Sequence, residues 1–387
     1  MHERLKVDYA GLELENPLVL GSGPPGWDGE SLRKAALAGA GAVVSKTIGP
    51  PERFARHPRC GRVRLARLEG SARAYGMINL ELYTTMSTSE WIERELPIAA
   101  TGKSKVIASI VAQADPIPGA EVALELEATG CVDMFEINVS CPMPDVTVGY
   151  LLGQDPKSVA AQVKAFRQRV HLPVSVKLTP TIGDIVPIAR AAEDEGADAL
   201  VVANSVRSFA GVDIEQGKPF LPAYGGYSGP AIKPITQRFV SEVARAVQIP
   251  ICALGGVRTW KDIVEYIMLG ATTVGVVTTV MWEGYEAIGL LLNGLQGFME
   301  RKGYDSLCEM RRIALPYITT IDQYASNPPL FISIDQQKCN DCQKCLSVCF
   351  YGALYSDGHL QARRERCDGC GLCVEICPKG ALRLTAW

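Results

Sequence analysis

Eight short apolar runs recur along the first three quarters of the chain, and most segments between them show helical periodicity. Continuous runs rich in Val, Ile and Leu are typical of parallel strands buried on both faces. The helical segments begin near Asp, Thr or Pro and end near Gly, as Pro156–Val170 and Thr259–Leu269 do. Eight such units predict an α/β fold, a (β/α)8 TIM barrel. Its strands are expected at Pro17–Gly21, Ala42–Ser45, Val106–Val111, Met134–Asn138, Val174–Leu178, Ala199–Ala203, Ile251–Leu254 and Thr273–Val277.

A doubly wound sheet is the alternative fold, but no GxGxxG sequence follows the first strand, so a dinucleotide-binding fold loses its main support. Two stretches, Pro50–Thr85 and Ser205–Pro230, are too long for simple connections. Loops of that length are usually lids or pocket walls. We therefore expect both to shape a binding site.

The composition changes abruptly near the C-terminus. A chain of 387 residues can bury one large core and leave a second, small domain. We expect the barrel over residues 1–302 and a tether over 303–330, which contains the Asn-Pro-Pro at 327–329. Residues 331–387 then form a cysteine-rich domain.

Eight of the thirteen cysteines follow the C-x2-C-x2-C-x3-C spacing of a bacterial ferredoxin with two 4Fe–4S clusters. Three thiolates of each tight turn bind one cluster, and the fourth cysteine of each run reaches the other cluster. Zinc is the alternative, but a zinc site needs no such exchange. The predicted ligand sets are Cys339, Cys342, Cys345 and Cys377 for one cluster and Cys367, Cys370, Cys373 and Cys349 for the other.

Two clusters transfer single electrons, so the barrel needs a group that exchanges electrons singly and performs chemistry in pairs, which a flavin does. Polar residues and glycines follow the predicted strands, at the catalytic face of a TIM barrel. Gly-Gly after strand seven and Thr-Thr after strand eight occupy the usual phosphate corner. The residues at this face are Gly21, Ser22, Lys46, Asn138, Lys177, Asn204, Gly255, Gly256, Thr278 and Thr279.

Lys46 and Lys177 end apolar strands, where a lysine is costly unless it meets an anionic or electron-rich partner. Either one alone could extend to the surface. Two at one barrel mouth favour contacts with a flavin, whose reduced ring is anionic.

The formal charge of −3, from 39 basic and 42 acidic residues, gives no field that would attract a phosphate backbone. The N-terminal sequence lacks an apolar stretch like that of a signal peptide, and Gly and Thr interrupt the longest apolar run. We expect a cytoplasmic protein that binds neither nucleic acid nor a membrane.

Several of these segments together resemble the dihydroorotate dehydrogenase family of FMN barrels, over essentially the whole barrel. With the ferredoxin module, the chain is most similar to the FMN and iron–sulfur part of dihydropyrimidine dehydrogenases, especially the bacterial subunits that work with a separate NAD-linked partner. The matching segments are NPLVLGSG, VSKTIG, the Asn79-Leu-Glu81-Leu stretch, EINVSCP, the Gly153-Gln-Asp-Pro156 stretch, VSVKLTP, VVANS, GGYSGPAIKPI and ALGG.

The resemblance implies roles for individual residues. Cys141 matches the family's acid–base cysteine on the loop after strand four, and Lys46 and Lys177 match FMN contacts. The positions that hold the pyrimidine ring are matched by Asn79, Glu81, Asn138, Asn204 and Ser205, with Ser140 between them. The phosphate end of FMN is matched by Gly229, Gly255, Gly256, Thr278 and Thr279.

Chemistry gives Cys141 an independent rationale. Reducing a conjugated C=C bond requires a hydride on one carbon and a proton on its neighbour, and a thiol with a pKa of about 8.5 is mostly protonated at neutral pH. Without the resemblance, a lone cysteine after a strand is more often packing. The same packing interpretation is kept for Cys60, Cys131, Cys252 and Cys308.

Glu81 bears on the substrate. A carboxylate in the pocket accepts hydrogen bonds from ring N–H groups and repels a substrate carboxylate, so it favours uracil or thymine over orotate. The alternative is an exposed glutamate on a helix surface. Met143, where relatives commonly carry a polar residue, and Ser205, where Thr is more usual, leave room for a less polar ring.

Three functions follow from these observations. The first is an enzyme that interconverts a pyrimidine and its 5,6-dihydro form, the second an electron-relay subunit, and the third a dihydroorotate dehydrogenase with an added ferredoxin. A relay has no use for Cys141 and the asparagine set, which favours catalysis. Because no glycine-rich turn offers a nicotinamide site, we expect an FAD- and NAD-binding partner or a free ferredoxin. The resemblance implies a homodimer of this chain within a hetero-oligomer.

Overall fold

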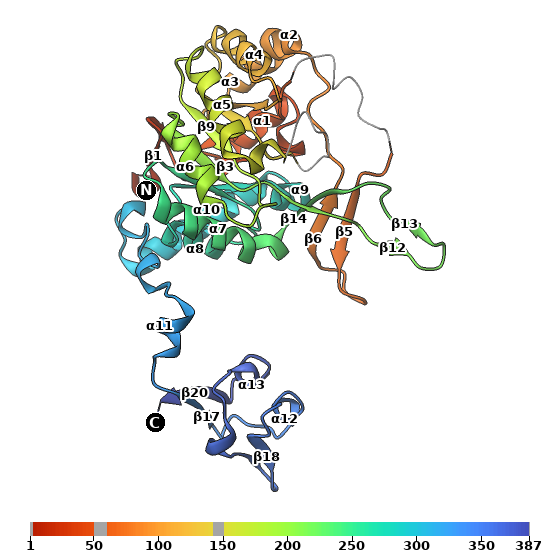
Figure 1. The fold of residues 1–387 in the computed structure, drawn as a ribbon, viewed down its shortest axis with the longest axis vertical. Coiled ribbons are helices and arrows are strands. Elements are labelled where there is room, and N and C mark those ends of the chain that lie inside the picture. Colours follow the sequence, from red (N-terminus) through yellow and green to blue (C-terminus); the bar gives the residue numbers. More distant parts are fainter. Residues whose placement is uncertain (1–2, 50–59, 142–150, 387) are drawn as a thin grey trace. The chain divides into compact units, whose positions relative to one another are not determined.

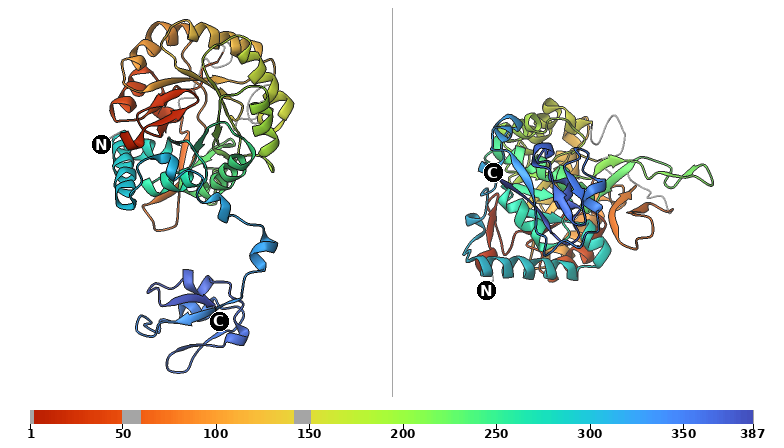
Figure 2. Two further views of the ribbon diagram at one scale, coloured as in Figure 1. Left: turned by 90° about the vertical axis from the view of Figure 1, so that its left-hand side faces the viewer. Right: turned by 90° about the horizontal axis from the view of Figure 1, so that it is seen from below.

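The computed structural model describes residues 3–49, 60–141 and 151–386. The chain divides into two compact units, Met1–Pro316 and Tyr317–Trp387. In the larger unit, parallel strands close into a barrel, which confirms the predicted fold (Figures 1 and 2). In chain order the barrel strands are β3 (Leu18–Leu20), β4 (Ala42–Val44), β7 (Lys105–Val111), β8 (Met134–Asn138), β9 (Val174–Lys177), β10 (Ala199–Val202), β15 (Ile251–Leu254) and β16 (Thr273–Val276).

Helices alternate with these strands and surround the barrel (Figure 2). Local sequence explains where they begin: Asp155 accepts hydrogen bonds from the backbone N–H groups of Lys157 and Ser158, which caps the helix that starts at Pro156. The helices of the larger unit are α1 (Gly29–Leu37), α2 (Thr88–Glu90), α3 (Leu96–Ala100), α4 (Ile117–Glu127), α5 (Pro156–Arg167), α6 (Val186–Asp194), α7 (Lys233–Ala246), α8 (Trp260–Met268), α9 (Thr278–Glu283) and α10 (Glu286–Lys302).

Alternate residues of most barrel strands enter different cores. Leu18 and Leu20 of β3 face outward and pack with the helices, whereas Val19 faces the barrel interior. A hairpin of β1 (Val7–Tyr9) and β2 (Leu12–Leu14) adds Tyr9 and Leu14 to the interior cluster. The barrel is therefore filled by side chains and not open.

The register brings the ends of neighbouring strands to one level. Asn138 at the end of β8 pairs with Val111 of β7 on one side and Lys177 of β9 on the other. Side chains that follow these strands therefore lie at the same edge of the barrel.

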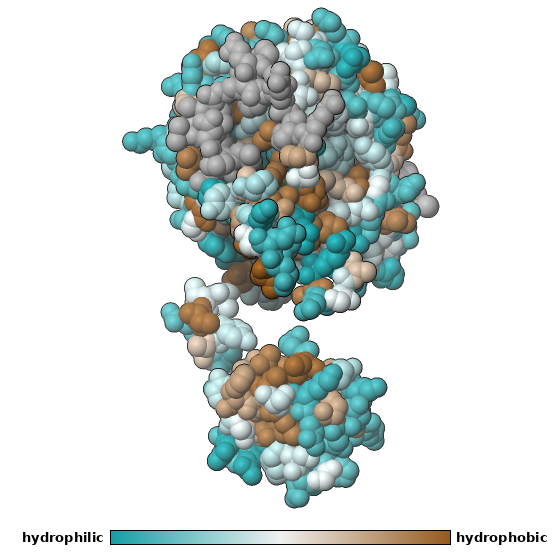
Figure 3. All heavy atoms as spheres, turned by 90° about the vertical axis from the view of Figure 1, so that its right-hand side faces the viewer, coloured by the Kyte–Doolittle hydropathy of each residue, from teal (hydrophilic) through white to brown (hydrophobic). Residues whose placement is uncertain are grey.

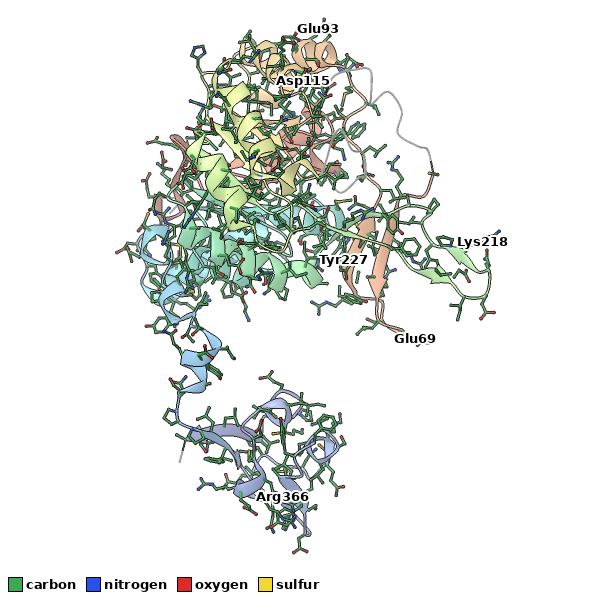
Figure 4. The ribbon with its side chains drawn as sticks, in the orientation of Figure 1. Glu69, Glu93, Asp115, Lys218, Tyr227 and Arg366 are labelled. Atoms are coloured by element: carbon green, nitrogen blue, oxygen red, sulfur yellow. The ribbon has the colours of Figure 1, made fainter. Side chains whose placement is uncertain are left out.

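Two long insertions fold into one additional sheet with the order β11-β14-β6-β5. It joins the expected pocket-wall segments, because Gly226 of β14 pairs with Asn79 of β6. Figure 4 shows Glu69 near the tip of one projecting hairpin and Lys218 on another. The strands are β5 (Val63–Arg67), β6 (Ala74–Asn79), β11 (Val206–Ser208) and β14 (Gly225–Ser228), and the second hairpin is β12 (Val212–Asp213) with β13 (Lys218–Pro219).

The segment after α10 differs from the expected tether. Leu307, Met310 and Leu315 are buried in the barrel's outer core, because they pack on its helices through two short 3-10 turns. The division between the two units falls after Pro316, where the short helix α11 (Ile321–Ala325) follows with no buried residue. The expected tether of 303–330 thus includes residues that belong to the barrel.

The smaller unit has a minimal core. Its buried cluster contains the aliphatic side chains of Ile332, Leu354, Leu360 and Leu382, and cysteines pack against them. Its elements are β17 (Leu330–Ile334), α12 (Lys344–Ser347), β18 (Leu354–Ser356), β19 (Leu360–Ala362), α13 (Leu372–Glu375) and β20 (Leu382–Ala386), with β17 paired to β20 and β18 to β19. Among the described residues of both units, no helix has the length and apolar character needed to cross a membrane.

Candidate active site and cluster sites

A cavity opens at the C-terminal ends of the barrel strands and is walled by the additional sheet. Most of the residues predicted from the sequence line it together. These are Ser22, Lys46, Asn79, Glu81, Asn138, Cys141, Lys177, Asn204, Ser205, Gly229, Gly255, Gly256 and Thr278. The strand ends and the sheet thus bring polar groups from distant parts of the chain to one site.

Two buried lysines lie in the cavity wall, and each has a carboxylate nearby. The Nζ of Lys177 is 3.7 Å from Oε1 of Glu136, and both side chains are almost fully buried. The Nζ of Lys46 donates to Oε2 of Glu81 at 3.2 Å and lies 5.8 Å from the ring of Trp27. Burial lowers the pKa of Lys46, and the charge of Glu81 offsets part of that effect.

Glu81 is a cavity residue and not an exposed glutamate, since its side chain is 13% exposed. Its second oxygen, Oε1, accepts from Nε of Arg62 at 3.2 Å. Two cations therefore share this carboxylate. Their positive charges weaken the repulsion expected between Glu81 and a substrate carboxylate.

Ser140 does not line the cavity but joins two residues that do. Its Oγ donates to Oδ1 of Asn138 at 2.9 Å and accepts from Nδ2 of Asn204 at 3.0 Å. Asn79, from the additional sheet, donates through Nδ2 to the carbonyl of Gly226 at 3.2 Å. The three asparagines are thus held by hydrogen bonds within the protein, which limits how their amides can turn.

Cys141 is buried and lines the cavity, three residues beyond the end of β8. Its side chain packs with Tyr83 and Val111. The thiol therefore lies at the cavity wall, close enough to Lys46 for the two groups to interact electrostatically. Met143, the departure noted in the sequence, lies outside the described residues.

The phosphate corner consists of glycines with backbone angles that side chains rarely adopt. Gly255 and Gly256 have φ values of +143° and +77°, and Gly229 has +92°. A Cβ atom on Gly256 would lie 2.6 Å from the Cβ of Lys233. Only glycine fits here, which leaves backbone N–H groups accessible for a phosphate. With the two lysines, this cradle fits the phosphate and ring of FMN.

Two other predicted residues lie behind the wall. Gly21 lines a small interior cavity with Tyr9 and Glu136, and the hydroxyl of Thr279 donates to the carbonyl of Val257. Sequence reasoning missed several lining residues: Met77, Tyr83 and Ser228 from the inserted segments, and Thr47 beside Lys46. Thr47 follows a strand end and could have been found by the rule that identified Lys46, whereas the inserted residues carry no comparable signal.

The eight ferredoxin cysteines form two groups in the smaller unit. Cys339, Cys342, Cys345 and Cys377 line one cavity, the set expected for the first cluster. In the second set, burial and the nearby charges of Cys349 and Cys370 raise the pKa of the Cys373 thiol to about 11. No three described Cys, His, Asp or Glu residues form a site for a single metal ion. The four cysteines of the first cavity fit a 4Fe–4S cluster, in which each thiolate binds a different iron.

The two cysteine runs have matching local geometry. Left-handed residues occupy equivalent positions in each run, Asp341 and Gln343 in the first and Gly369 and Gly371 in the second. In both runs the backbone N–H four residues after the last cysteine donates to its sulfur at 3.3 Å, from Ala353 to Cys349 and from Ala381 to Cys377. Such N–H···S bonds favour the thiolate, the form that binds iron.

Among the remaining cysteines, the packing interpretation fits Cys252 but not the two that are exposed. Cys252 is buried in the barrel interior, and burial raises the pKa of its thiol to about 12. Cys131 is half-buried, and Cys60 and Cys308 are exposed. Cys252 is thus a neutral core residue.

Comparison with known proteins follows the same division of the chain. Residues 4–299 match the family model for dihydroorotate dehydrogenase, and residues 331–378 match a 4Fe–4S dicluster domain. The catalytic subunit of dihydroorotate dehydrogenase B (NAD(+)) from Methanothermobacter thermautotrophicus is 37% identical over 312 residues, 80% of this chain and 98% of that relative. The corresponding subunit of Methanosarcina mazei is 38% identical over 315 residues, 80% of this chain and 95% of that relative.

A relative with a different name matches more of the chain. The NAD-dependent dihydropyrimidine dehydrogenase subunit PreA of Escherichia coli K12 is 30% identical over 357 residues, 90% of this chain and 86% of that relative. Its alignment is longer than those of the two dihydroorotate dehydrogenase subunits, which span 80% of this chain. The chain belongs to the dihydroorotate dehydrogenase family of FMN-binding CH–CH oxidoreductases, extended by a ferredoxin domain for 4Fe–4S clusters.

Proposed function

We propose that the protein interconverts a pyrimidine of the uracil or thymine type and its 5,6-dihydro form. The observation that carries this proposal is the shared cavity: the thiol of Cys141 and the amides of Asn79, Asn138 and Asn204 line the same space as two buried lysines. Amide side chains complement the alternating C=O and N–H groups of a cyclic imide. A pure electron relay would need none of these groups at the flavin.

The residues divide the chemistry between them. FMN supplies hydride transfer when it is bound. Cys141 holds the proton that the neighbouring ring carbon gains on reduction and takes it back on oxidation. Lys46 and Lys177 place positive charge at the cavity wall, where it stabilises an electron-rich ring.

Charge balance in the cavity favours a neutral substrate over one with a carboxylate. Each lysine in the described lining has a carboxylate within 3.7 Å: Glu81 for Lys46 and Glu136 for Lys177. A substrate carboxylate would therefore compete for cations that are already paired. The ferredoxin domain, in a chain that aligns so far along subunit PreA, supports the same substrate class.

Dihydroorotate is the second candidate substrate. Two observations favour it: the higher identity to the dihydroorotate dehydrogenase B subunits, and the contact of Arg62 with Glu81, which adds a second cation at that wall. The chemistry at Cys141 would be the same, and only the ring substituent would change.

We further propose that electrons pass through the two clusters to or from a separate FAD- and NAD-binding subunit, with a free ferredoxin as the alternative partner. The smaller unit presents an apolar area in Figure 3, and its exposed apolar side chains include Phe350, Leu372 and Ile376. Phe350 follows Cys349 directly. Leu372, the first residue of α13, directly precedes Cys373, and Ile376 directly precedes Cys377. Apolar surface beside a cluster suits the docking of an electron-transfer partner.

Anaerobic turnover tests both parts of the proposal. Uracil is incubated with the purified chain and a dithionite-reduced dye, and dihydrouracil is measured by chromatography. We expect dihydrouracil with the dye and none with NADH or NADPH alone. Steady turnover with NADH alone would contradict the separate partner, and dye-driven reduction of orotate without reduction of uracil would contradict the substrate.

A further inference from the structure

A line of buried hydroxyl groups connects the barrel interior to the cavity. Ser109 Oγ donates to Oε1 of Glu136 at 2.8 Å, and Thr47 Oγ1 lies 3.0 Å from Ser109 Oγ. At the cavity, Thr47 Oγ1 accepts from Nδ2 of Asn138 at 3.0 Å and lies 3.3 Å from Ser22 Oγ. Glu136 and Ser109 are 1% and 0% exposed, so water does not compete for these bonds.

Counting protons gives this line one direction. Glu136, as the carboxylate beside Lys177, can only accept, so Ser109 gives it its single hydroxyl proton. Ser109 can then only accept, and Thr47 must donate to it. Having used its proton, Thr47 accepts from both Asn138 and Ser22.

The same count decides what Asn138 offers to the cavity. Its Oδ1 accepts from the N–H and the hydroxyl of Ser140, at 3.1 and 2.9 Å, and one Nδ2 proton goes to Thr47. The second Nδ2 proton remains, so Asn138 faces a ligand as a donor. Asn204 is the opposite: its Nδ2 donates both protons to the carbonyl and hydroxyl of Ser140, so it can offer a ligand only Oδ1, which also accepts from the N–H of Ser205 at 2.8 Å and from its hydroxyl at 3.5 Å. A fixed donor beside a fixed acceptor complements the C=O and N–H of a cyclic imide.

We propose that Glu136 is a positioning residue that acts through Ser109 and Thr47 to hold Asn138 as a hydrogen-bond donor to the ring carbonyl. This inference rests on the proposed function for the ring that is bound, and it adds three residues that the sequence did not identify. Without the carboxylate, the hydroxyl proton of Thr47 could point toward Asn138. Nδ2 of Asn138 would then lose its acceptor, and although Ser140 would still hold Oδ1, the second Nδ2 proton would be less firmly directed at the ring carbonyl.

Single substitutions along the line test the proposal. The dissociation constants of uracil and orotate are measured anaerobically with the FMN- and cluster-loaded protein, from the perturbation of flavin absorbance. Ser109→Ala removes the link without touching the cavity wall. Ser175→Ala is the matched control, because Ser175 is equally buried and its hydroxyl donates only to the backbone carbonyl of Phe135. Thr47→Val removes the hydroxyl at nearly constant volume, and Thr47→Ser retains it.

We expect Ser109→Ala to weaken uracil binding by about three- to tenfold, the effect of one buried hydrogen bond, and Thr47→Val to weaken it further. Thr47→Ser and Ser175→Ala should bind as the wild type does, and all four variants should retain FMN and thermal stability close to it. If Ser109→Ala behaves like Ser175→Ala, or Thr47→Ser like Thr47→Val, the proposal is overturned. If the wild-type protein binds orotate and not uracil, the proposed substrate is contradicted. The variants are then ranked by their dissociation constants for orotate, and that ranking still tests the role of Glu136, Ser109 and Thr47.

Discussion

Replacing Glu81 by Gln leaves the ammonium of Lys46 without its carboxylate in a buried position. The two side chains are 13% and 6% exposed, and their charged atoms are 3.2 Å apart. Removing one partner of a buried ion pair costs about 3–5 kcal/mol. Because Glu81 is not fully buried, we expect the lower end, about 3 kcal/mol, which corresponds to a fall in Tm of about 5 °C or more in a domain of this size.

The loss should depend on pH in a defined direction. Burial already lowers the pKa of Lys46 from its ordinary value of 10.5, and without the charge of Glu81 the pKa falls further. A lysine whose pKa is lower in the folded than in the unfolded protein lowers the stability of the fold. This cost is at its full value at any pH below the folded pKa, and it disappears as pH rises to the unfolded pKa. The deficit of the variant should therefore be largest at neutral pH and shrink as pH approaches 10.5.

Thermal unfolding followed by circular dichroism and flavin fluorescence, from neutral to alkaline pH, measures this effect. Glu30→Gln is a matched control, because Glu30 pairs with Arg33 at the surface, where solvent screening leaves such a pair little effect on stability. The double variant Lys46→Met with Glu81→Gln removes the unpaired charge and should recover much of the stability. If Glu81→Gln and Glu30→Gln have the same Tm at every pH, the ion pair of Lys46 and Glu81 does not have the assigned strength.

Three further variants test other parts of the site. Cys141→Ala should retain FMN and slow ring reduction by about 10²–10⁴-fold, the usual contribution of a general acid, whereas near-native turnover would make Cys141 a packing residue. The loaded chain should contain about eight irons in two clusters, and Cys349→Ser should lose iron from one of them. An unchanged iron content would contradict the assignment of Cys349 as a ligand. Gly256→Ala places a methyl group against Lys233 at a position with left-handed backbone angles, so we expect it to bind less FMN. Gly61→Ala is the control, because no atom lies within 4 Å of its added Cβ. Equal FMN content in the two variants would contradict a close contact of Gly256 with the phosphate.

The barrel could be predicted because its strands are buried on both faces. Such strands appear as continuous apolar runs, and the polar residue that ends each run, such as Lys46, Asn138 or Lys177, falls at the catalytic face. The cysteine spacing was equally informative, since each tight turn must present three thiolates.

The rest of the site depends on contacts between distant segments. Asn79 reaches the cavity because its strand pairs with Gly226, 147 residues later, and no local pattern records that pairing. Arg62 on Glu81 and the burial of Met310 against the barrel are likewise tertiary contacts. The direction of the Thr47 hydroxyl requires interatomic distances that a sequence does not contain.

The central claim is that the cavity oxidises and reduces a neutral pyrimidine ring at FMN. Anaerobic mixing of the oxidised protein with dihydrouracil, dihydrothymine or dihydroorotate, followed by flavin absorbance in a stopped-flow instrument, tests it most directly. We predict rapid bleaching of the flavin by dihydrouracil or dihydrothymine and little change with dihydroorotate. Bleaching by dihydroorotate alone would assign the chain to orotate chemistry, and bleaching by none of the three would contradict pyrimidine chemistry at this site.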